Sequence, residues 1–251
     1  MAPEVILFPG AWARSKTATW WWLKAFIARY KTSGQRWHYP SYEGRSLNEM
    51  SDAYADYIKA NVPGKAKLVM IGYSMGGQVL RALHARHPHL ASRTIQVILI
   101  SCPGRHGITV PALAELIKRA PLSLACAVGG QIAFRSHEEA ARVIFNGQLP
   151  PTDKTVRQLV AISQNWPEPM WPLGANLFLP GRRTNLPPID RRIPVLRTWS
   201  ETDPFQIGGR EDKDETSECL MLRGDHSLIR FPENFPIPTR NKLREAIARK
   251  H

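Results

Sequence analysis

The sequence predicts an α/β fold: a mostly parallel sheet of about six strands, flanked by helices. In the first hundred residues, short apolar runs alternate with longer amphipathic segments. The apolar runs do not alternate with polar residues, which is typical of strands buried on both faces of a parallel sheet. Parallel strands need long, right-handed connections, and the amphipathic segments are long enough to supply them as helices. The 251 residues, 43% of them hydrophobic, can form one such domain with an insertion.

Four strands and three helices are expected before residue 103. The strands cover residues 5–8, 35–39, 67–71 and 94–101, and the helices cover 17–30, 47–57 and 78–86. Ser46 and Glu49 form a capping box, which predicts where the second of these helices begins. Strands and helices therefore follow one another in the order that a doubly covered sheet requires.

This alternation stops after Cys102. Residues 103–190 contain eleven of the 21 prolines and show only helical patterns, at 136–145 and 153–163. The aromatic, proline-rich stretch "NWPEPMWPLGANLFLPGRR" is expected to be packed irregular chain. Strand patterns resume at 195–199 and 219–222, and a last helix covers 240–249. The sequence thus predicts a core of residues 1–102 and 191–251, with a helical cap at residues 103–190 inserted after the fourth strand.

Composition narrows the possible classes of function. The net charge is +13, but Lys and Arg are spread along the chain, so we expect no specific nucleic-acid partner. The three cysteines form no CxxC pair, which argues against a zinc site or a disulfide framework. No apolar run approaches a membrane span, and neither a secretory signal nor a dinucleotide or P-loop motif is found. We expect a cytoplasmic protein, a monomer or homodimer, with no cofactor and no metal.

Ser74 lies between a buried strand and a helix, in the pattern Gly72-Tyr73-Ser74-Met75-Gly76. A nucleophilic serine at such a turn takes a strained conformation, and small flanking residues avoid clashes of Cβ atoms. The helix that follows would direct N–H groups and its positive dipole end towards the same point. A plain glycine-rich turn is the alternative interpretation.

A nucleophilic serine also needs a base and an acid, and both are found beyond later strands. Asp203 follows the strand at 195–199, and His226 follows the strand at 219–222. Because parallel strands end at one edge of the sheet, we expect both residues to approach Ser74. The sequence therefore predicts a Ser74-Asp203-His226 triad in which His226 accepts the serine proton. The rival acids are Glu201, Asp212, Asp214, Glu215 and Asp225.

Backbone donors and substrate contacts are expected around the same turn. The N–H of Met75 follows the nucleophile and is one expected donor of an oxyanion hole. The second donor should come from "FPGAWARS", at Ala11 or Trp12, of which we choose Ala11. Trp12 is either a core residue or a wall of an acyl pocket. We expect Trp12 and Tyr73 to contact the substrate.

Several stretches resemble the α/β-hydrolase family of the lipase and esterase type with a cap. "VILFPGAW" resembles its first strand and oxyanion loop, although Pro9 replaces the usual histidine, and "GYSMGG" resembles its nucleophile elbow. "LRTWSETDPF" is similar to its acid strand and "GDHSLIRFPENF" to its histidine loop. The resemblance implies hydrolysis of a small-molecule carboxylic ester through an acyl-serine, without a cofactor. Thioesters, lactones and C–C bonds are cleaved by the same triad, and a non-catalytic ligand-binding protein with this fold is the alternative of another class.

Overall fold

A computed structural model describes residues 2–121, 123–124, 133–164, 186–207, 218–222 and 224–249. Six strands form one sheet in the order β2-β1-β3-β4-β5-β6, and every neighbouring pair is parallel. The strands are β1 (Glu4–Phe8), β2 (Trp37–His38), β3 (Leu68–Tyr73), β4 (Thr94–Ile100), β5 (Val195–Ser200) and β6 (Glu218–Leu222). The prediction of a six-stranded parallel sheet is confirmed.

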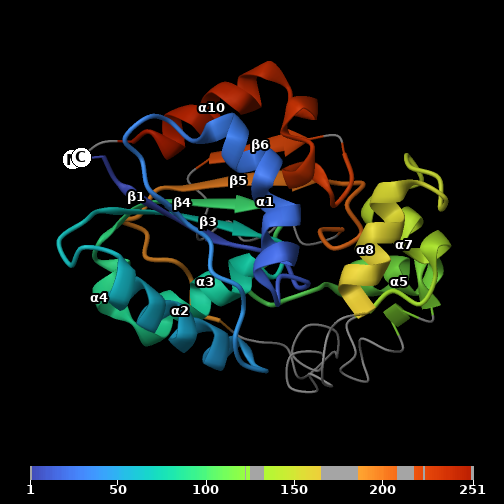
Figure 1. The fold of residues 1–251 in the computed structure, drawn as a ribbon, viewed down its shortest axis with the longest axis horizontal. Helices are drawn as coiled ribbons and strands as arrows, with labels where there is room; N and C mark the ends of the chain where they lie inside the picture. Colours follow the sequence, from blue (N-terminus) through green and yellow to red (C-terminus); the bar gives the residue numbers. More distant parts are fainter. Residues whose placement is uncertain are drawn as a thin grey trace.

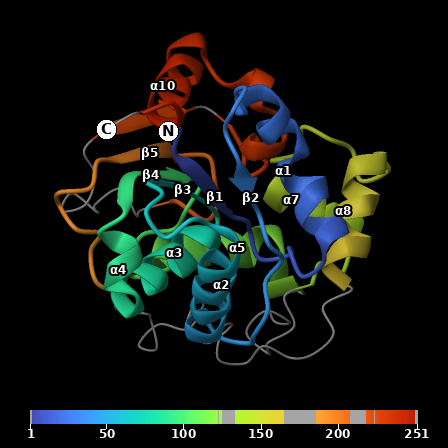
Figure 2. The ribbon, with the colours of Figure 1, turned by 60° about the vertical axis from the view of Figure 1, so that its left-hand side comes forward.

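Helices cover both faces of this sheet. One face is covered by α1 (Lys16–Tyr30) and α10 (Ile237–Ile247), and the other by α2 (Leu47–Asn61), α3 (Gly76–Arg86) and α4 (Pro88–Ala91) (Figures 1 and 2). Every residue of β1, β3, β4 and β5 is buried, because both faces are covered. Two short 3₁₀ turns, η1 (Leu228–Arg230) and η2 (Pro232–Asn234), lead from the end of the sheet into α10.

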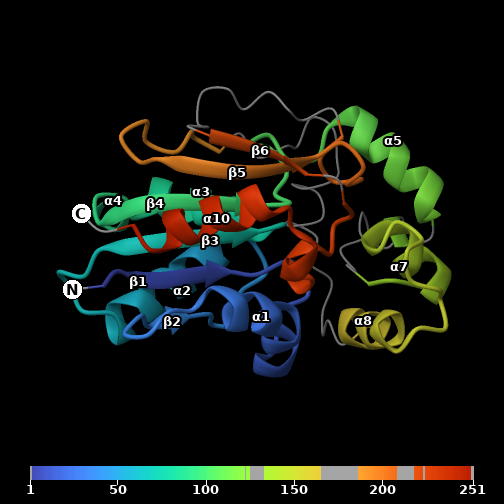
Figure 3. The same ribbon diagram turned by 90° about the horizontal axis from the view of Figure 1, so that it is seen from above.

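The described helices between β4 and β5 lie apart from these two layers. They are α5 (Val110–Arg119), α7 (His137–Ile144) and α8 (Lys154–Gln164). Viewed from above, they lie beyond the arrowheads of the strands, at the carboxyl-terminal edge of the sheet (Figure 3). In parallel α/β sheets this edge is where ligands bind, so these helices lie over the expected site.

Local sequence signals explain where several helices begin. The hydroxyls of Ser15, Ser46, Thr109 and Ser136 each accept the N–H three residues later, at the starts of α1, α2, α5 and α7. The capping box predicted at Ser46 is only half formed. The Glu49 carboxylate accepts the N–H of Arg45, at 2.6 Å, instead of the N–H of Ser46 itself.

Several elements differ from the sequence prediction, among them the short helix α4, which was not expected. The strand expected over 35–39 is only Trp37–His38, because β2 is an edge strand that pairs with β1 alone and ends before Pro40. Helix α5, with Pro111 in its first turn, was not predicted as a separate element. The stretch 165–183, expected to be irregular, lies outside the described residues.

Candidate active site

Ser74 lies at the sharp turn between β3 and α3, with a φ of +54°. A non-glycine residue in this left-handed region stores about 1–3 kcal/mol of strain, which the surrounding packing must maintain. The neighbouring glycines allow that packing. A Cβ on Gly72 would lie 2.8 Å from Gly77 Cα, and a Cβ on Gly76 would overlap the carbonyl group of Phe8 in β1. The turn therefore requires glycine where helix α3 packs directly on the ends of two strands.

The side chains of Ser74, His226 and Asp203 form a continuous chain of contacts. His226 Nε2 lies 2.7 Å from Ser74 Oγ, and His226 Nδ1 lies 2.9 and 3.0 Å from the two carboxylate oxygens of Asp203. Asp203 is fully buried and His226 is 1% exposed, whereas Ser74 is partly exposed. A hydroxyl, an imidazole and a buried carboxylate in this order can move a proton from oxygen to nitrogen and stabilise the imidazolium that results.

Two aromatic residues hold the His226 ring in place. Phe205 lies against it with ring centroids 4.2 Å apart, and Tyr73 lies 5.5 Å away. The Tyr73 hydroxyl donates a hydrogen bond to the backbone carbonyl of His226 at 2.7 Å. Burial raises the pKa of Tyr73 well above its ordinary value, so this hydroxyl keeps its proton and remains a donor. Tyr73 thus ties the backbone of β3 to that of the histidine loop.

The histidine loop is also attached to the end of β5. The hydroxyls of Ser200 and Thr202 both donate to the carbonyl of Gly224, each at 2.7 Å. Asp225 accepts hydrogen bonds from the N–H and the hydroxyl of Ser227, which shapes the turn into η1. These contacts place the loop that carries Asp203 beside the loop that carries His226.

The two rival acids within the described residues do not occupy the position of Asp203 beside the His226 ring. Asp225 is engaged with Ser227, and burial raises the pKa of its carboxyl. Glu201 is exposed at the end of β5. The other three, Asp212, Asp214 and Glu215, lie outside the described residues.

The loop after β1 passes close to Ser74. A Cβ on Gly10 would lie 3.5 Å from the Cβ of Ser74. The buried hydroxyl of Tyr42 donates to the carbonyl of Pro9 at 2.6 Å. This bond anchors the loop at Pro9, the residue that replaces the histidine expected from the family resemblance. Within the described part of the chain, the N–H groups of Ala11 and Met75 have no hydrogen-bond acceptor. Both residues border the same cavity as Ser74.

That cavity lies between the sheet edge and the segment between β4 and β5. The empty space between its lining residues, open solvent at the mouth included, is about 720 Å³. Its described wall is largely apolar: Ala11, Trp12, Ser74, Met75, Pro103, Ile108, Leu116, Ala120, Ser123, Leu124, Ala133, Phe134, Val143 and Phe205. Such a wall suits an uncharged ligand, because desolvating a charge there would be costly.

The cavity includes some expected residues and adds others. Trp12 is part of its wall and lies against Phe134, with the two rings tilted by 37° and their centroids 5.0 Å apart. Tyr73 is not among the described wall residues, and its ring packs near that of His226 instead. Sequence reasoning did not find Phe205 or Ser123. A large apolar residue directly after Asp203-Pro204 was a usable signal for Phe205, whereas Ser123 had none.

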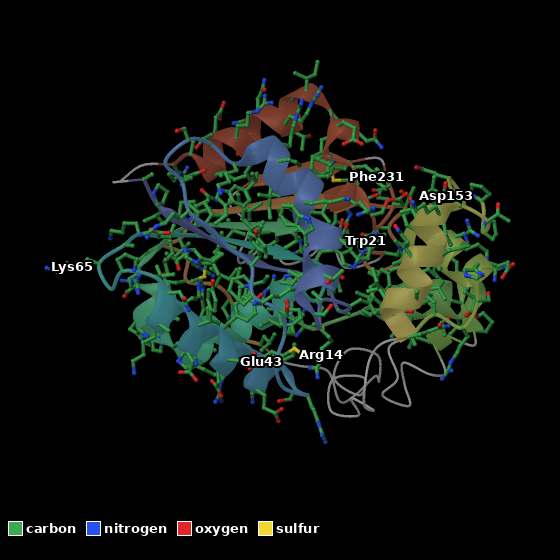
Figure 4. The ribbon with its side chains drawn as sticks, viewed as in Figure 1. Arg14, Trp21, Glu43, Lys65, Asp153 and Phe231 are labelled. Atoms are coloured by element: carbon green, nitrogen blue, oxygen red, sulfur yellow. The ribbon has the colours of Figure 1, made fainter. Side chains whose placement is uncertain are left out.

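Trp21 connects the core to one of the helices beyond the sheet. It extends from α1 on the side nearest α8 (Figure 4). Its indole N–H donates to the Gln158 side chain of α8 at 2.9 Å. The guanidinium of Arg230, in η1, lies 3.6 Å from the ring centroid and donates to the Trp21 carbonyl. Trp21 therefore contacts both helix α8 and the segment that follows His226.

Two searches of the described ranges bear on other expectations. No cluster of three or more His, Cys, Asp or Glu side chains in them could hold a metal ion. None of the helices within those ranges has both the length and the apolar character needed to cross a membrane.

Comparisons with known proteins agree with this architecture. No curated protein matches the chain by sequence. Among solved structures, an extracellular alpha/beta-hydrolase from a Paenibacillus species is similar over 99% of this chain and 100% of its own, with a TM-score of 0.64 and 16% identity. Its structure is described as sharing structural and functional homology with tobacco salicylic acid binding protein 2.

Two esterases show the same likeness of fold. A thermophilic esterase from Thermogutta terrifontis, with malate bound, matches over 99% of this chain and 92% of its own (TM-score 0.63, 17% identity). A carboxylesterase from Bacillus subtilis matches over 98% and 84% (TM-score 0.62, 12% identity). A family model described as "Alpha/beta hydrolase family" matches residues 5–235. The chain therefore belongs to the alpha/beta hydrolase family.

Proposed function

We propose that this protein hydrolyses carboxylic esters through an acyl-enzyme formed on Ser74. The observation that carries the proposal is the chain of contacts from Ser74 through His226 to Asp203 at the border of an apolar cavity. In the neutral tautomer with its proton on Nδ1, His226 donates to Asp203 and accepts the hydroxyl proton of Ser74. The esterases among the similar structures support this choice of reaction at the level of the fold.

Acylation uses these groups in a fixed order. Ser74 Oγ attacks the ester carbonyl carbon while its proton passes to His226 Nε2, and the carbonyl oxygen becomes an oxyanion. The N–H groups of Ala11 and Met75 would donate to that oxyanion, which explains why they need no acceptor in the protein. When the C–O bond of the ester breaks, the His226 proton passes to the departing alcohol. Asp203 remains ionised and stabilises the imidazolium.

Deacylation repeats these steps with water. His226 takes a proton from a water molecule, whose oxygen attacks the acyl carbon, and the proton then returns to Ser74 Oγ as the acid leaves. We further propose that residues 103–190 form a cap over the core of residues 1–102 and 191–251. Helices α5 and α7 of this segment contribute Leu116 and Val143 to the cavity wall, so the cap would select the substrate by shape.

The direct test uses the wild-type protein. It should hydrolyse p-nitrophenyl esters, from acetate to palmitate, with a preference set by the size of the cavity. Diisopropyl fluorophosphate should inactivate it, and mass spectrometry of the digest should locate one label on Ser74. Hydrolysis of thioesters or lactones alone would show that the ester assignment is wrong while the acyl-serine stands. A protein that hydrolyses none of these compounds and takes no label would contradict the proposal as a whole.

Tyr73→Phe is expected to lower kcat about fivefold and to leave KM within about twofold. The substitution removes the hydrogen bond to the His226 carbonyl, worth about 1 kcal/mol, while the ring stays packed. We therefore assign Tyr73 a role in positioning His226 in place of the substrate contact expected from the sequence. Steady-state kinetics with one ester measures the split between kcat and KM.

The matched control is Tyr54→Phe. Tyr54 is also buried and donates to backbone carbonyls, those of Leu7 and Pro40, away from His226. Both variants should lose similar amounts of stability in urea, because each loses a buried hydrogen bond. Equal losses of kcat in the two variants would show that Tyr73 has only a structural role.

A further inference from the structure

The cavity wall contains one hydroxyl besides that of Ser74 within the described residues, and it belongs to Ser123. Ser123 follows α5 closely in the segment between β4 and β5, and it is 7% exposed. Every other described wall residue has an apolar side chain, apart from the indole of Trp12. A buried hydroxyl in such a wall is costly unless its hydrogen bonds are made, so its partners indicate what it can still bind.

Ser123 is bound to the start of α7. Its hydroxyl donates to one carboxylate oxygen of Glu139, and its backbone N–H donates to the other at 3.4 Å. The N–H of Arg135 donates to the Ser123 hydroxyl oxygen at 3.0 Å. Glu139 is itself only 3% exposed. The single proton of this hydroxyl is therefore already committed to a buried carboxylate.

The remaining hydrogen-bonding capacity of Ser123 is that of an acceptor. A serine hydroxyl has one proton and two lone pairs, and the proton and one lone pair are used by Glu139 and Arg135. Within the described residues one lone pair remains unused, and Ser123 borders the cavity. A charged group of either sign would lose its hydration against the apolar wall of the cavity, which is costly. A neutral donor, above all an alcohol, fits both conditions.

We propose that Ser123, held by Glu139, is a recognition point for a hydroxyl group on the substrate. Resting on the proposed function, this inference makes the substrate a neutral ester with an apolar chain and a hydroxyl remote from the scissile carbonyl. Ser74 acts on the ester group, and Ser123 accepts a hydrogen bond from the remote hydroxyl. Carboxylate-bearing esters of the same length should be poor substrates, because the apolar wall offers no compensation for a desolvated charge.

The test compares methyl esters of straight-chain acids of four to ten carbons, with and without a terminal hydroxyl. For the best-fitting length, wild type should show roughly tenfold higher kcat/KM with the hydroxylated ester, the value of one hydrogen bond. Ser123→Ala should remove this preference, measured within the variant as the ratio of kcat/KM for the hydroxylated ester to kcat/KM for the plain ester. Ser123→Thr, which keeps a hydroxyl, should restore part of the preference.

Ser163→Ala is the control for the loss of a buried hydroxyl outside the described cavity wall. Ser163 is a fully buried serine of α8 whose hydroxyl accepts the N–H of Phe134 at 3.0 Å, and it is not among the described wall residues. This variant should keep the preference. An equal rate of wild type on both ester series, or a preference that survives in Ser123→Ala, would overturn the proposal.

Binding separates this inference from the hydrolytic proposal. Calorimetric titration of Ser74→Ala with the two ester series measures affinity without turnover. Tighter binding of the hydroxylated ester, lost in the Ser74→Ala, Ser123→Ala double variant, supports the recognition point even if wild type hydrolyses no ester. Equal affinities overturn it even if wild type is an active esterase.

Discussion

Ser74→Ala is expected to lower kcat for ester hydrolysis by a factor on the order of 10⁵–10⁶. The variant lacks the oxygen that forms the acyl-enzyme, and His226 has no proton to accept at 2.7 Å. A residual rate about 10³-fold above that of water should remain, because the oxyanion donors are backbone groups that the substitution leaves in place. The measurement is steady-state hydrolysis of the best p-nitrophenyl ester, at protein concentrations high enough to detect the residual rate.

Ser101→Ala is a closely matched control for this experiment. Ser101 follows β4 as Ser74 follows β3, and it too has a left-handed conformation, with a φ of +49°. It is fully buried, and its hydroxyl has no hydrogen-bond partner in the part of the chain that the structure describes. The kcat of the Ser101→Ala variant should stay close to that of wild type. If Ser74→Ala kept more than a few per cent of wild-type kcat, Ser74 would not be the nucleophile.

Gly76→Ala is expected to lower the free energy of unfolding by about 5 kcal/mol or more, enough to prevent folding of a domain of ordinary stability. A Cβ at this position would lie 2.5 Å from the carbonyl carbon of Phe8 and 2.7 Å from the carbonyl oxygen of Pro9. These atoms cannot move aside, because β1 is paired with strands on both sides. Helix α3 would have to shift away from the sheet and expose its apolar face.

Soluble yield and urea unfolding followed by circular dichroism measure this effect. Gly64→Ala is the control, because nothing lies within 4 Å of the added Cβ and the backbone there is not left-handed. Its free energy of unfolding should change by less than about 0.5 kcal/mol. A wild-type unfolding midpoint for Gly76→Ala would mean that α3 can separate from β1 at little cost.

Much of the fold could be predicted because its signals are local. The start of α2 is set by Ser46, whose hydroxyl accepts the Glu49 N–H as the sequence suggests. The buried strands β1, β3, β4 and β5 are short apolar runs, and the sheet they form is parallel as expected. Predictions were least accurate where pairing decides the outcome. At the sheet edge, β2 has one neighbour and pairs only at Trp37 and His38.

The candidate site, too, was predicted from local signals only in part. Ser74, Asp203 and His226 each lie just past a strand, and parallel strands bring such positions to one edge of the sheet. The order of strands and residues in the sequence does not determine where a side chain points. Tyr73 was expected to face the substrate, yet its hydroxyl reaches the backbone of His226, 153 residues away in the chain.

The sequence by itself determined the order of elements, the turn that carries Ser74 and the residues available at the strand ends, because these depend on neighbours within a few turns of chain. Only the tertiary structure decided that Asp203 contacts His226 while Asp225 turns to Ser227. It alone brought Ser123 to the wall of the cavity. The physical reason is that such contacts join segments far apart in sequence, whose distances are set by sheet order and packing rather than by local propensity.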